Sequence, residues 1–252
     1  MVKKNAPTLL EQYLQKPKYQ PATIALSGNT DCYQPVERKL KITRELLKVF
    51  LKYQHPVGII TKNTLIARDL DLLAPLAQQE LTRVHFSITT LNESLRRKME
   101  PRTSTSRQKL NTIEKLSQQG IPVSIMIGPI IPGLNDHEIP DIMSAAAQAG
   151  ARSAGFTMVR LNGQIGQVFE DWLRQAYPDR AEKILNQIRG AHGGKLNDSR
   201  FGKRMKGDGI MVESIHRMFE LSKKKYFGST AHRAPLRTDL FVKTHRGQMG
   251  LF

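Results

Sequence analysis

The hydrophobic pattern of this chain alternates between short apolar runs and longer segments of helical period. The apolar runs are typical of buried strands and fall at Thr23–Leu26, Val57–Thr61, Val84–Thr89, Val123–Ile127 and Ala154–Val159. Between them the apolar residues recur at helical spacing, which predicts helices over Glu37–Tyr53, Leu65–Gln78, Glu93–Met99, Arg107–Gln119 and Glu138–Ala149. Such alternation predicts an α/β fold with a parallel sheet, either open or curled toward a barrel.

The alternation ends after Val159. Helical patterns over Phe169–Ala176, Arg180–Arg189 and Ile210–Lys225 have no strand between them. The last segment, 227–252, mixes glycine, proline, histidine and arginine without a period, and we expect it to be poorly ordered. The sequence thus predicts a partial parallel barrel over 1–160, a helical extension packed on it over 161–226, and a basic tail over 227–252.

The charge of the chain is strongly positive and uneven. The 252 residues include 39 Lys and Arg against 22 Asp and Glu, a net charge of +17. From Arg189 to the C-terminus there are 14 basic and 5 acidic residues, against 25 and 17 in the residues before it. A basic segment of this kind favours nucleic acid as a partner. The alternative is a solvated basic surface, because charge alone carries no specificity.

Several classes of protein are excluded by what the sequence lacks. No stretch approaches the roughly 18 apolar residues of a membrane span, and Met1–Pro7 does not resemble a signal peptide, so we expect a cytoplasmic protein. The single cysteine, Cys32, excludes an internal disulfide and a metal or cluster site built from several thiolates. The seven histidines lack zinc-ligand spacing, and neither GxxxxGK[ST] nor GxGxxG occurs.

Polar or glycine-rich loops follow the carboxyl ends of successive predicted strands, where parallel sheets and barrels bind ligands. We predict that these loops form one pocket. The candidate ligand-binding residues are Ser27, Gly28, Asn29, Asp31, Lys62, Ser87, Thr89, Gly128, Ile130 and Gly133. Each has a structural alternative: Ser27 and Asp31 can hold a turn, Asn63 can cap a helix, and the two prolines between Gly128 and Gly133 can stiffen a loop.

Lys62 suggests a separate chemistry. A desolvated lysine at the end of a barrel strand can form a Schiff base with a carbonyl substrate. An exposed or phosphate-binding lysine is the commoner case. This hypothesis describes an enzyme that needs no cluster.

Four segments together resemble a known family. They read SGNTDCYQP at Ser27–Pro35, ITKN at Ile60–Asn63, SITT at Ser87–Thr90 followed by EPRT at Glu100–Thr103, and PIIPGLND at Pro129–Asp136. In this order they resemble the radical S-adenosylmethionine (radical SAM) superfamily, and most the branch that contains spore photoproduct lyase. The resemblance covers roughly residues 1–226. It implies a partial (β/α)6 barrel in which a [4Fe–4S] cluster, held by a CxxxCxxC loop, reduces S-adenosylmethionine to a 5′-deoxyadenosyl radical.

The resemblance also implies roles for the candidate residues. Ser27, Gly28 and Asn29 stand where the family receives the methionine amino group. Ser87 and Thr89 stand on the strand whose polar residues reach the ribose or the carboxylate. The segment Gly128–Gly133 matches the one that packs near the adenine.

The chain departs from the family at the cluster motif. That motif needs three cysteines, whereas this sequence has one, Cys32, which follows what would be the second strand. Matching the predicted strands to the family leaves the first strand and its cysteine loop missing. We therefore expect an N-terminally truncated fragment, inactive alone: a gene broken upstream, a start codon assigned too late, or one half of a split protein whose other chain carries the motif.

Two other functions stay open from the sequence. One is a nucleic-acid-binding protein that uses the basic C-terminal segment, and the other is the cluster-free enzyme that uses Lys62. The missing strand also predicts that Thr23–Leu26 lies at the edge of the sheet, with backbone groups unpaired on one side.

Overall fold

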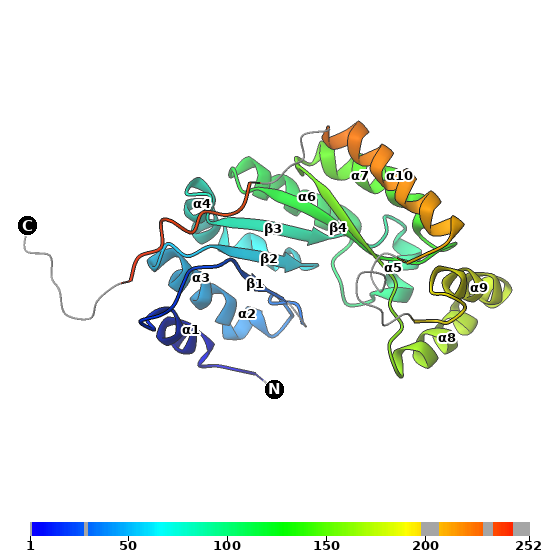
Figure 1. The fold of residues 1–252 in the computed structure, drawn as a ribbon, viewed down its shortest axis with the longest axis horizontal. Helices are drawn as coiled ribbons and strands as arrows, with labels where there is room; N and C mark the ends of the chain where they lie inside the picture. The colour runs from blue at the N-terminus through cyan, green and yellow to red at the C-terminus, as the bar shows by residue number, and fades with distance from the viewer. Residues whose placement is uncertain (1, 28–29, 198–206, 229–233, 244–252) are drawn as a thin grey trace, which may run out of the picture. The chain divides into compact units, whose positions relative to one another are not determined.

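The computed structural model of the chain describes residues 2–27, 30–197, 207–228 and 234–243 (Figure 1). The chain divides into two compact units. Unit 1 contains Met1–His85, Glu114–Val123 and Arg233–Phe252, and unit 2 contains Phe86–Ile113 and Ser124–His232. The predicted division into barrel, extension and tail stays a prediction.

One parallel sheet contains all five predicted strands, in the spatial order β1-β2-β3-β4-β5. This order equals the order along the chain, which successive right-handed βα crossovers generate. The α/β partial-barrel fold is thereby confirmed. The strands are β1 Ile24–Leu26, β2 Val57–Thr61, β3 Thr82–Ser87, β4 Val123–Ile130 and β5 Ala154–Met158.

The first strand lies at the edge of the sheet, as predicted. β1 pairs in parallel with β2, with Ile24 opposite Val57, and among the described residues the strand order places no other strand beside it. The expectation that this strand is buried is wrong, because Ala25 is exposed and Ile24 and Leu26 are only partly buried. A strand with one neighbour has fewer side chains around it than a central strand, and β1 is only three residues long.

The helices of unit 1 follow the sequence pattern, except that the predicted helices Glu37–Tyr53 and Leu65–Gln78 are each divided into two. They are α1 Ala6–Leu14, α2 Glu37–Leu40, α3 Ile42–Lys52, the 3-10 helix η1 Thr64–Asp69 and α4 Leu70–Gln78. The predicted helix Glu37–Tyr53 is two helices because Lys41 takes a left-handed conformation, with φ of 51°. Asn63 caps η1: its side-chain oxygen accepts a hydrogen bond from Leu65 N at 2.9 Å.

Unit 2 contains the remaining helices, of which α6 continues into unit 1. They are α5 Glu93–Met99, α6 Ser106–Gln118, η2 Asp136–Glu138, α7 Ile139–Gln148, α8 Ile165–Ala176, η3 Pro178–Arg180, α9 Ala181–Ala191 and α10 Ile210–Phe227. α10 packs against α7. A buried cluster joins Ile184 and Ile188 of α9 to Ile131, which follows β4, and to Val159, which follows β5. The core therefore holds α9 against the carboxyl ends of these two strands.

Residues 234–243 differ from the poorly ordered tail that the sequence predicts. They form no helix or strand, yet Arg237 N donates to Glu80 O at 3.2 Å and Val242 N donates to Tyr53 O at 3.1 Å. The ring of Phe241 packs edge-on against Tyr19 and His55. The sequence pattern could not reveal the packing of this segment, because backbone hydrogen bonds and the contacts of a single aromatic side chain produce no periodic signal.

Among the helices of the described residues, none combines the length and apolar composition that crossing a membrane requires.

Candidate functional site

Asp31 joins the loop after β1 to the end of β2. Its Oδ1 accepts hydrogen bonds from Tyr33 N at 2.8 Å and from the Thr61 hydroxyl at 2.7 Å, and its Oδ2 accepts one from Lys62 N at 2.7 Å. Backbone N–H groups and a hydroxyl are the partners that a structural carboxylate needs. Asp31 therefore fixes the relation between two strand ends within unit 1.

Ser27 closes the same loop from its other side. It has a φ of 81°, the left-handed region that residues with a side chain seldom adopt, and its Oγ accepts a hydrogen bond from Cys32 N at 2.7 Å. The Thr43 hydroxyl donates to Cys32 O at 2.5 Å, which ties the loop to α3. Two other candidates, Gly28 and Asn29, lie outside the described residues.

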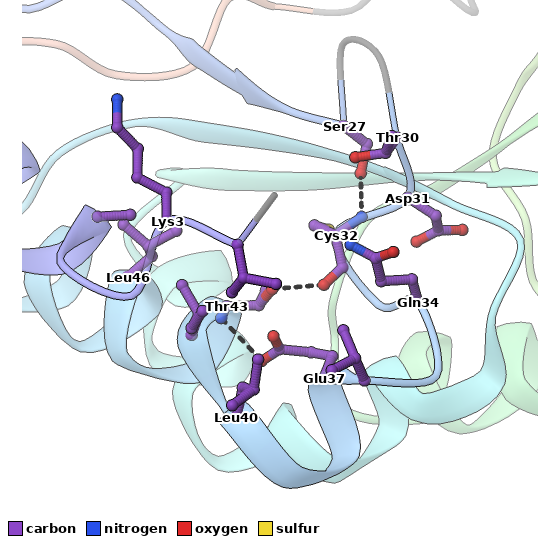
Figure 2. A pocket seen from close by; sticks show the side chains of 14 residues that line it. Lys3, Ser27, Thr30, Asp31, Cys32, Gln34, Glu37, Leu40, Thr43 and Leu46 are labelled. Atoms are coloured by element: carbon purple, nitrogen blue, oxygen red, sulfur yellow. Dashed lines mark hydrogen bonds between the residues drawn. The ribbon is translucent and has the colours of Figure 1, made fainter.

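A cavity of about 530 Å³ lies beside this loop, between it and the starts of α1, α2 and α3 (Figure 2). Cavities of this size accept small organic ligands. One side is polar and the other aliphatic, so an amphipathic ligand suits it. The lining residues are Val2, Lys3, Ala6, Ser27, Thr30, Asp31, Cys32, Gln34, Val36, Glu37, Leu40, Ile42, Thr43 and Leu46.

The Cys32 thiol lines this cavity but is a poor nucleophile and metal ligand. Burial raises its pKa from 9.0 to about 12, more than the hydrogen bond with Ser27 lowers it. The thiol is therefore protonated at neutral pH, whereas alkylation and metal binding need the thiolate.

We expect iodoacetamide to label Cys32 far more slowly in the native chain than in urea. At pH 8 the rise in pKa to about 12 reduces the thiolate fraction by roughly three orders of magnitude relative to a thiol with a pKa of 9.0. The measurement is the labelled fraction against time by intact-mass spectrometry. Equal rates in native and denatured chain would show that the thiol is not buried.

Lys62 stays only a prediction as a Schiff-base lysine. Its side chain is only partly buried, although its backbone N–H is held by Asp31. A Schiff-base lysine needs an environment that removes its charge by desolvation. The structure therefore gives the cluster-free enzyme no support.

In unit 2, Thr89 and Asn135 connect the residues after β3 to the end of β4 and to the loop that follows it. The Thr89 hydroxyl lies 2.9 Å from Glu100 Oε1 and 3.1 Å from Gly128 O. The Asn135 amide donates to Thr89 O at 2.8 Å and to Pro129 O at 3.0 Å, and its oxygen accepts from Ile131 N at 2.7 Å. Asn135 is fully buried, so these bonds are shielded from water.

The other candidates in unit 2 are determined by packing. A Cβ on Gly128 would lie 2.5 Å from Thr157 Oγ1, and one on Gly133 would overlap the Gln187 amide, so protein neighbours already explain both glycines. Gly133 also has a φ of 75°. Ile130 is fully buried in β4, and Ser87 is buried at the end of β3.

Sequence reasoning missed a buried ion pair beside Thr89. Lys109 Nζ lies 3.5 Å from Glu100 Oε2, with 1% of the Lys109 side chain and 12% of the Glu100 side chain exposed. It also missed Glu138, which accepts hydrogen bonds from the Thr90 hydroxyl at 2.5 Å and from Leu91 N at 2.7 Å. The spacing of nine residues between Glu100 and Lys109 gives no periodic signal. Glu100 does begin the EPRT segment that resembles the family.

The candidate residues thus form two groups. Ser27, Asp31 and Lys62 are joined by the loop of unit 1, and Thr89 and Gly128 belong to the Asn135 network of unit 2. Gly133 N donates instead to Asp136 Oδ1 at 2.8 Å. Hydrogen bonds link the strand ends within each unit.

Comparison with known proteins identifies the family. The model of the radical SAM superfamily matches residues 6–146. This chain therefore belongs to the radical SAM superfamily.

Its relatives include uncharacterized proteins. One from Mycobacterium tuberculosis is 30% identical over 181 residues, which are 71% of this chain and 53% of that protein. One from Methanocaldococcus jannaschii is 29% identical over 187 residues, which are 74% of this chain and 67% of that protein. The chain spans about half the length of the mycobacterial relative.

Solved structures of spore photoproduct lyase share the fold. A mutant with bound AdoMet and dinucleoside spore photoproduct has a TM-score of 0.61 at 15% identity, covering 88% of this chain and 64% of that chain. The lyase complexed with dinucleoside spore photoproduct has a TM-score of 0.60 at 15% identity, with the same coverage. At this identity the likeness establishes the fold and not the substrate.

The iron–sulfur cluster that the family implies does not fit the residues of this chain. The sequence has one cysteine, and its thiol is kept protonated by burial. In the described ranges, no three His, Cys, Asp or Glu side chains gather where they could hold a metal ion. A [4Fe–4S] cluster is normally held by several thiolates.

Proposed function

We propose that this chain forms the S-adenosylmethionine-binding part of a radical SAM enzyme whose cluster ligands come from a polypeptide segment outside this sequence. The observation that carries the proposal is the cavity of about 530 Å³ beside β1. It is lined by Ser27, which stands where the family receives the methionine amino group. It lies next to an edge strand that can pair with a further segment.

The lining of the cavity suits the amino-acid end of S-adenosylmethionine. Asp31 and Glu37 line the cavity with negative charge, which favours an ammonium group beside the bonds that they make to Lys62 N and Arg68, and Lys3 adds a cation to the lining for the carboxylate. Leu40 and Leu46 offer aliphatic surface on the other side. In the family, the cluster supplies the electron that cleaves the sulfonium. The residues of this chain would bind and orient the molecule and exclude water.

The test compares this chain with and without a cysteine-bearing segment. Reconstituted alone with iron and sulfide under anaerobic conditions, the chain should hold no stoichiometric [4Fe–4S] cluster, because one thiol cannot hold four irons. Joined to the segment encoded immediately upstream of Met1, in one chain or as two, it should bind the cluster. It should then cleave S-adenosylmethionine to 5′-deoxyadenosine on reduction.

The readouts are iron content, the visible absorption spectrum and an S-adenosylmethionine binding isotherm. A stoichiometric cluster in the isolated chain that disappears in Cys32→Ala would refute the proposal. Upstream DNA that encodes no CxxxCxxC would restrict the source of the cluster ligands to a separate chain.

A second function is favoured by the charge of the chain. We propose that the segment from Arg189 onward binds nucleic acid without sequence preference, since it carries 14 basic and 5 acidic residues. Arg217, Lys224 and Lys225 of α10 are exposed among the described residues of this segment.

Binding to duplex DNA should then weaken steeply with salt. If Z phosphates are contacted, log K should fall with log salt at a slope of about −0.9Z. The measurement is fluorescence anisotropy of a labelled duplex at several salt concentrations. A matched variant with Arg217, Lys224 and Lys225 replaced by Gln should show a shallower slope. A slope unchanged after deletion of 189–252 would assign the binding to another surface.

A further inference from the structure

Residues 234–243 form a C-terminal strap that crosses unit 1 near the starts of β2 and β3 (red in Figure 1). Most of its residues are exposed, and it has no regular secondary structure. Arg83 of β3 donates a hydrogen bond from Nη2 to Ala234 O at 2.8 Å, and Lys243 Nζ donates one to Pro17 O at 2.9 Å. A segment with few buried side chains and exposed hydrogen bonds opens at a lower cost in free energy than the core does.

One side chain of the strap, Phe241, packs into the hydrophobic core of unit 1. It contacts a cluster that contains Leu14, the last residue of α1, and Tyr53, which follows α3 directly. Ile24 of β1 packs against the same cluster. The strap therefore holds the end of α1 against the end of α3, and these two helices pack on each other.

The ring of His55 lies beside Phe241 and is fully buried. Its centroid lies 5.5 Å from that of Phe241, 5.6 Å from that of Phe50 and 5.8 Å from that of Tyr19. His55 Nε2 lies 2.6 Å from the Tyr19 hydroxyl, and Nδ1 makes no hydrogen bond with a described residue. Aromatic rings and one neutral hydroxyl thus surround this histidine.

A charged His55 would have no counterion in this cluster. The titratable and charged side chains on the segments that meet there are Glu11, Tyr13, Lys16, Lys18, Tyr19, Lys52, Tyr53, Arg237, Asp239 and Lys243. Both acids among them are paired with other groups, Glu11 with Lys52 at 2.6 Å and Asp239 with Arg237 at 2.6 Å. Contact with aromatic faces replaces only part of the hydration that a buried imidazolium loses.

The protonation of His55 is consequently linked to the strap. Burial lowers the pKa of His55 below its ordinary value of 6.5, and the neighbouring backbone of Pro56 opposes this only in part. When Phe241 leaves, one side of the ring opens to water, and the pKa rises toward the ordinary value. The lower pKa in the docked state means that docking has its full stability above pH 6.5 and weakens as the pH falls below it.

We propose that the C-terminal strap is a latch on α1 that protonation of His55 releases. At neutral pH the imidazole is uncharged and the strap is docked, whereas in acid the strap opens so that water reaches the imidazolium. Ala6, at the start of α1, lines the cavity beside β1, so release of the strap loosens one wall of that cavity. The latch goes beyond the proposed function, since neither a cluster nor S-adenosylmethionine takes part in it.

Hydrogen exchange of the 252-residue chain at pH 7.5 and pH 5.5 measures the release. The protection factors of the Arg237 and Val242 amides, each taken relative to the unfolded chain at the same pH, should fall by about three- to tenfold at pH 5.5. The amides of α1 should lose protection over the same pH range. Equal protection of the strap at both pH values would overturn the proposal, and protection lost from the strap but not from α1 would show that the strap does not hold this helix.

Two variants identify the titrating group. His55→Phe keeps an aromatic ring in the cluster but cannot be protonated, so its strap should stay protected at both pH values. His137→Gln replaces an exposed histidine of η2, and as the matched control it should keep the pH dependence of the parent. A His55→Phe chain with the pH dependence of the parent would refute the role of His55.

The reverse effect gives a test that needs no substitution of the buried histidine. Because docking and protonation are linked, removing the anchor with Phe241→Ala should raise the pKa of His55. It should also abolish the protection of the Val242 amide at both pH values. The pKa is measured from the ring proton and carbon chemical shifts of His55 by NMR. Identical titration of His55 in the parent and in Phe241→Ala would overturn the proposal.

Discussion

Replacing Lys109 by Met should destabilise the chain by about 3–5 kcal/mol, the cost of removing one partner of a buried ion pair. The Lys109 side chain is 1% exposed and its Nζ lies 3.5 Å from Glu100 Oε2. Met fills the volume of the lysine stem, so the loss of stability comes from removing the positive charge. It leaves the Glu100 carboxylate, whose side chain is 12% exposed, without the lysine charge where little water can solvate it.

The double variant Lys109→Met/Glu100→Gln identifies the cause. Gln is neutral and can still accept the Thr89 hydroxyl bond, which spans 2.9 Å to Glu100 Oε1. It should recover most of the stability, because the uncompensated charge is gone. The measurement is the free energy of unfolding in urea by circular dichroism. Lys115→Met, on the exposed side of the same helix, should change it by less than about 0.5 kcal/mol. A small effect of Lys109→Met would show that the pair is solvated.

The strands were predictable because each is a local apolar run in a regular βα alternation. The predictions failed where a single backbone conformation or a distant contact decides the structure. Lys41 breaks the helix predicted over Glu37–Tyr53, and nothing in the spacing marks a residue with φ of 51°. Phe241 holds residues 234–243 to Tyr53 and Tyr19, which precede it by nearly the whole chain.

The candidate site was predictable in position more than in chemistry. Strand ends follow from the pattern, so Ser27, Asp31 and Thr89 could be selected as a class. Their hydrogen bonds to neighbouring strand ends could not be predicted, because side-chain partners depend on tertiary distances. The same holds for Gly128, where the side chain of Thr157 occupies the space that a ligand was expected to need.

Asn135→Leu should cost about 3–6 kcal/mol and loosen the strand ends of unit 2. Leu has nearly the same size, but it leaves the backbone groups Ile131 N, Thr89 O and Pro129 O without the bonds of 2.7, 2.8 and 3.0 Å that Asn135 makes. A buried polar group that loses its partner costs about 1–3 kcal/mol, and the residue is fully buried. Thr89 and the Gly128–Gly133 segment should then lose their fixed relation.

Asn135→Asp keeps the oxygen that accepts from Ile131 N and removes the amide that donates to Thr89 O and Pro129 O. The carboxylate can accept from Ile131 N but faces two carbonyl oxygens, so it should also destabilise the chain at pH 7. Repulsion and burial raise the pKa of such a carboxyl above that of an unfolded aspartate. Its destabilising effect should therefore shrink as the pH falls below the raised pKa, where the protonated acid can donate to one carbonyl. Urea unfolding at pH 7 and pH 5 measures this change. Asn111→Leu, on the exposed side of α6, is the control and should alter stability by less than about 0.5 kcal/mol. If Asn135→Asp is destabilising to the same extent at both pH values, the amide donors to Thr89 and Pro129 are not what holds the two strand ends.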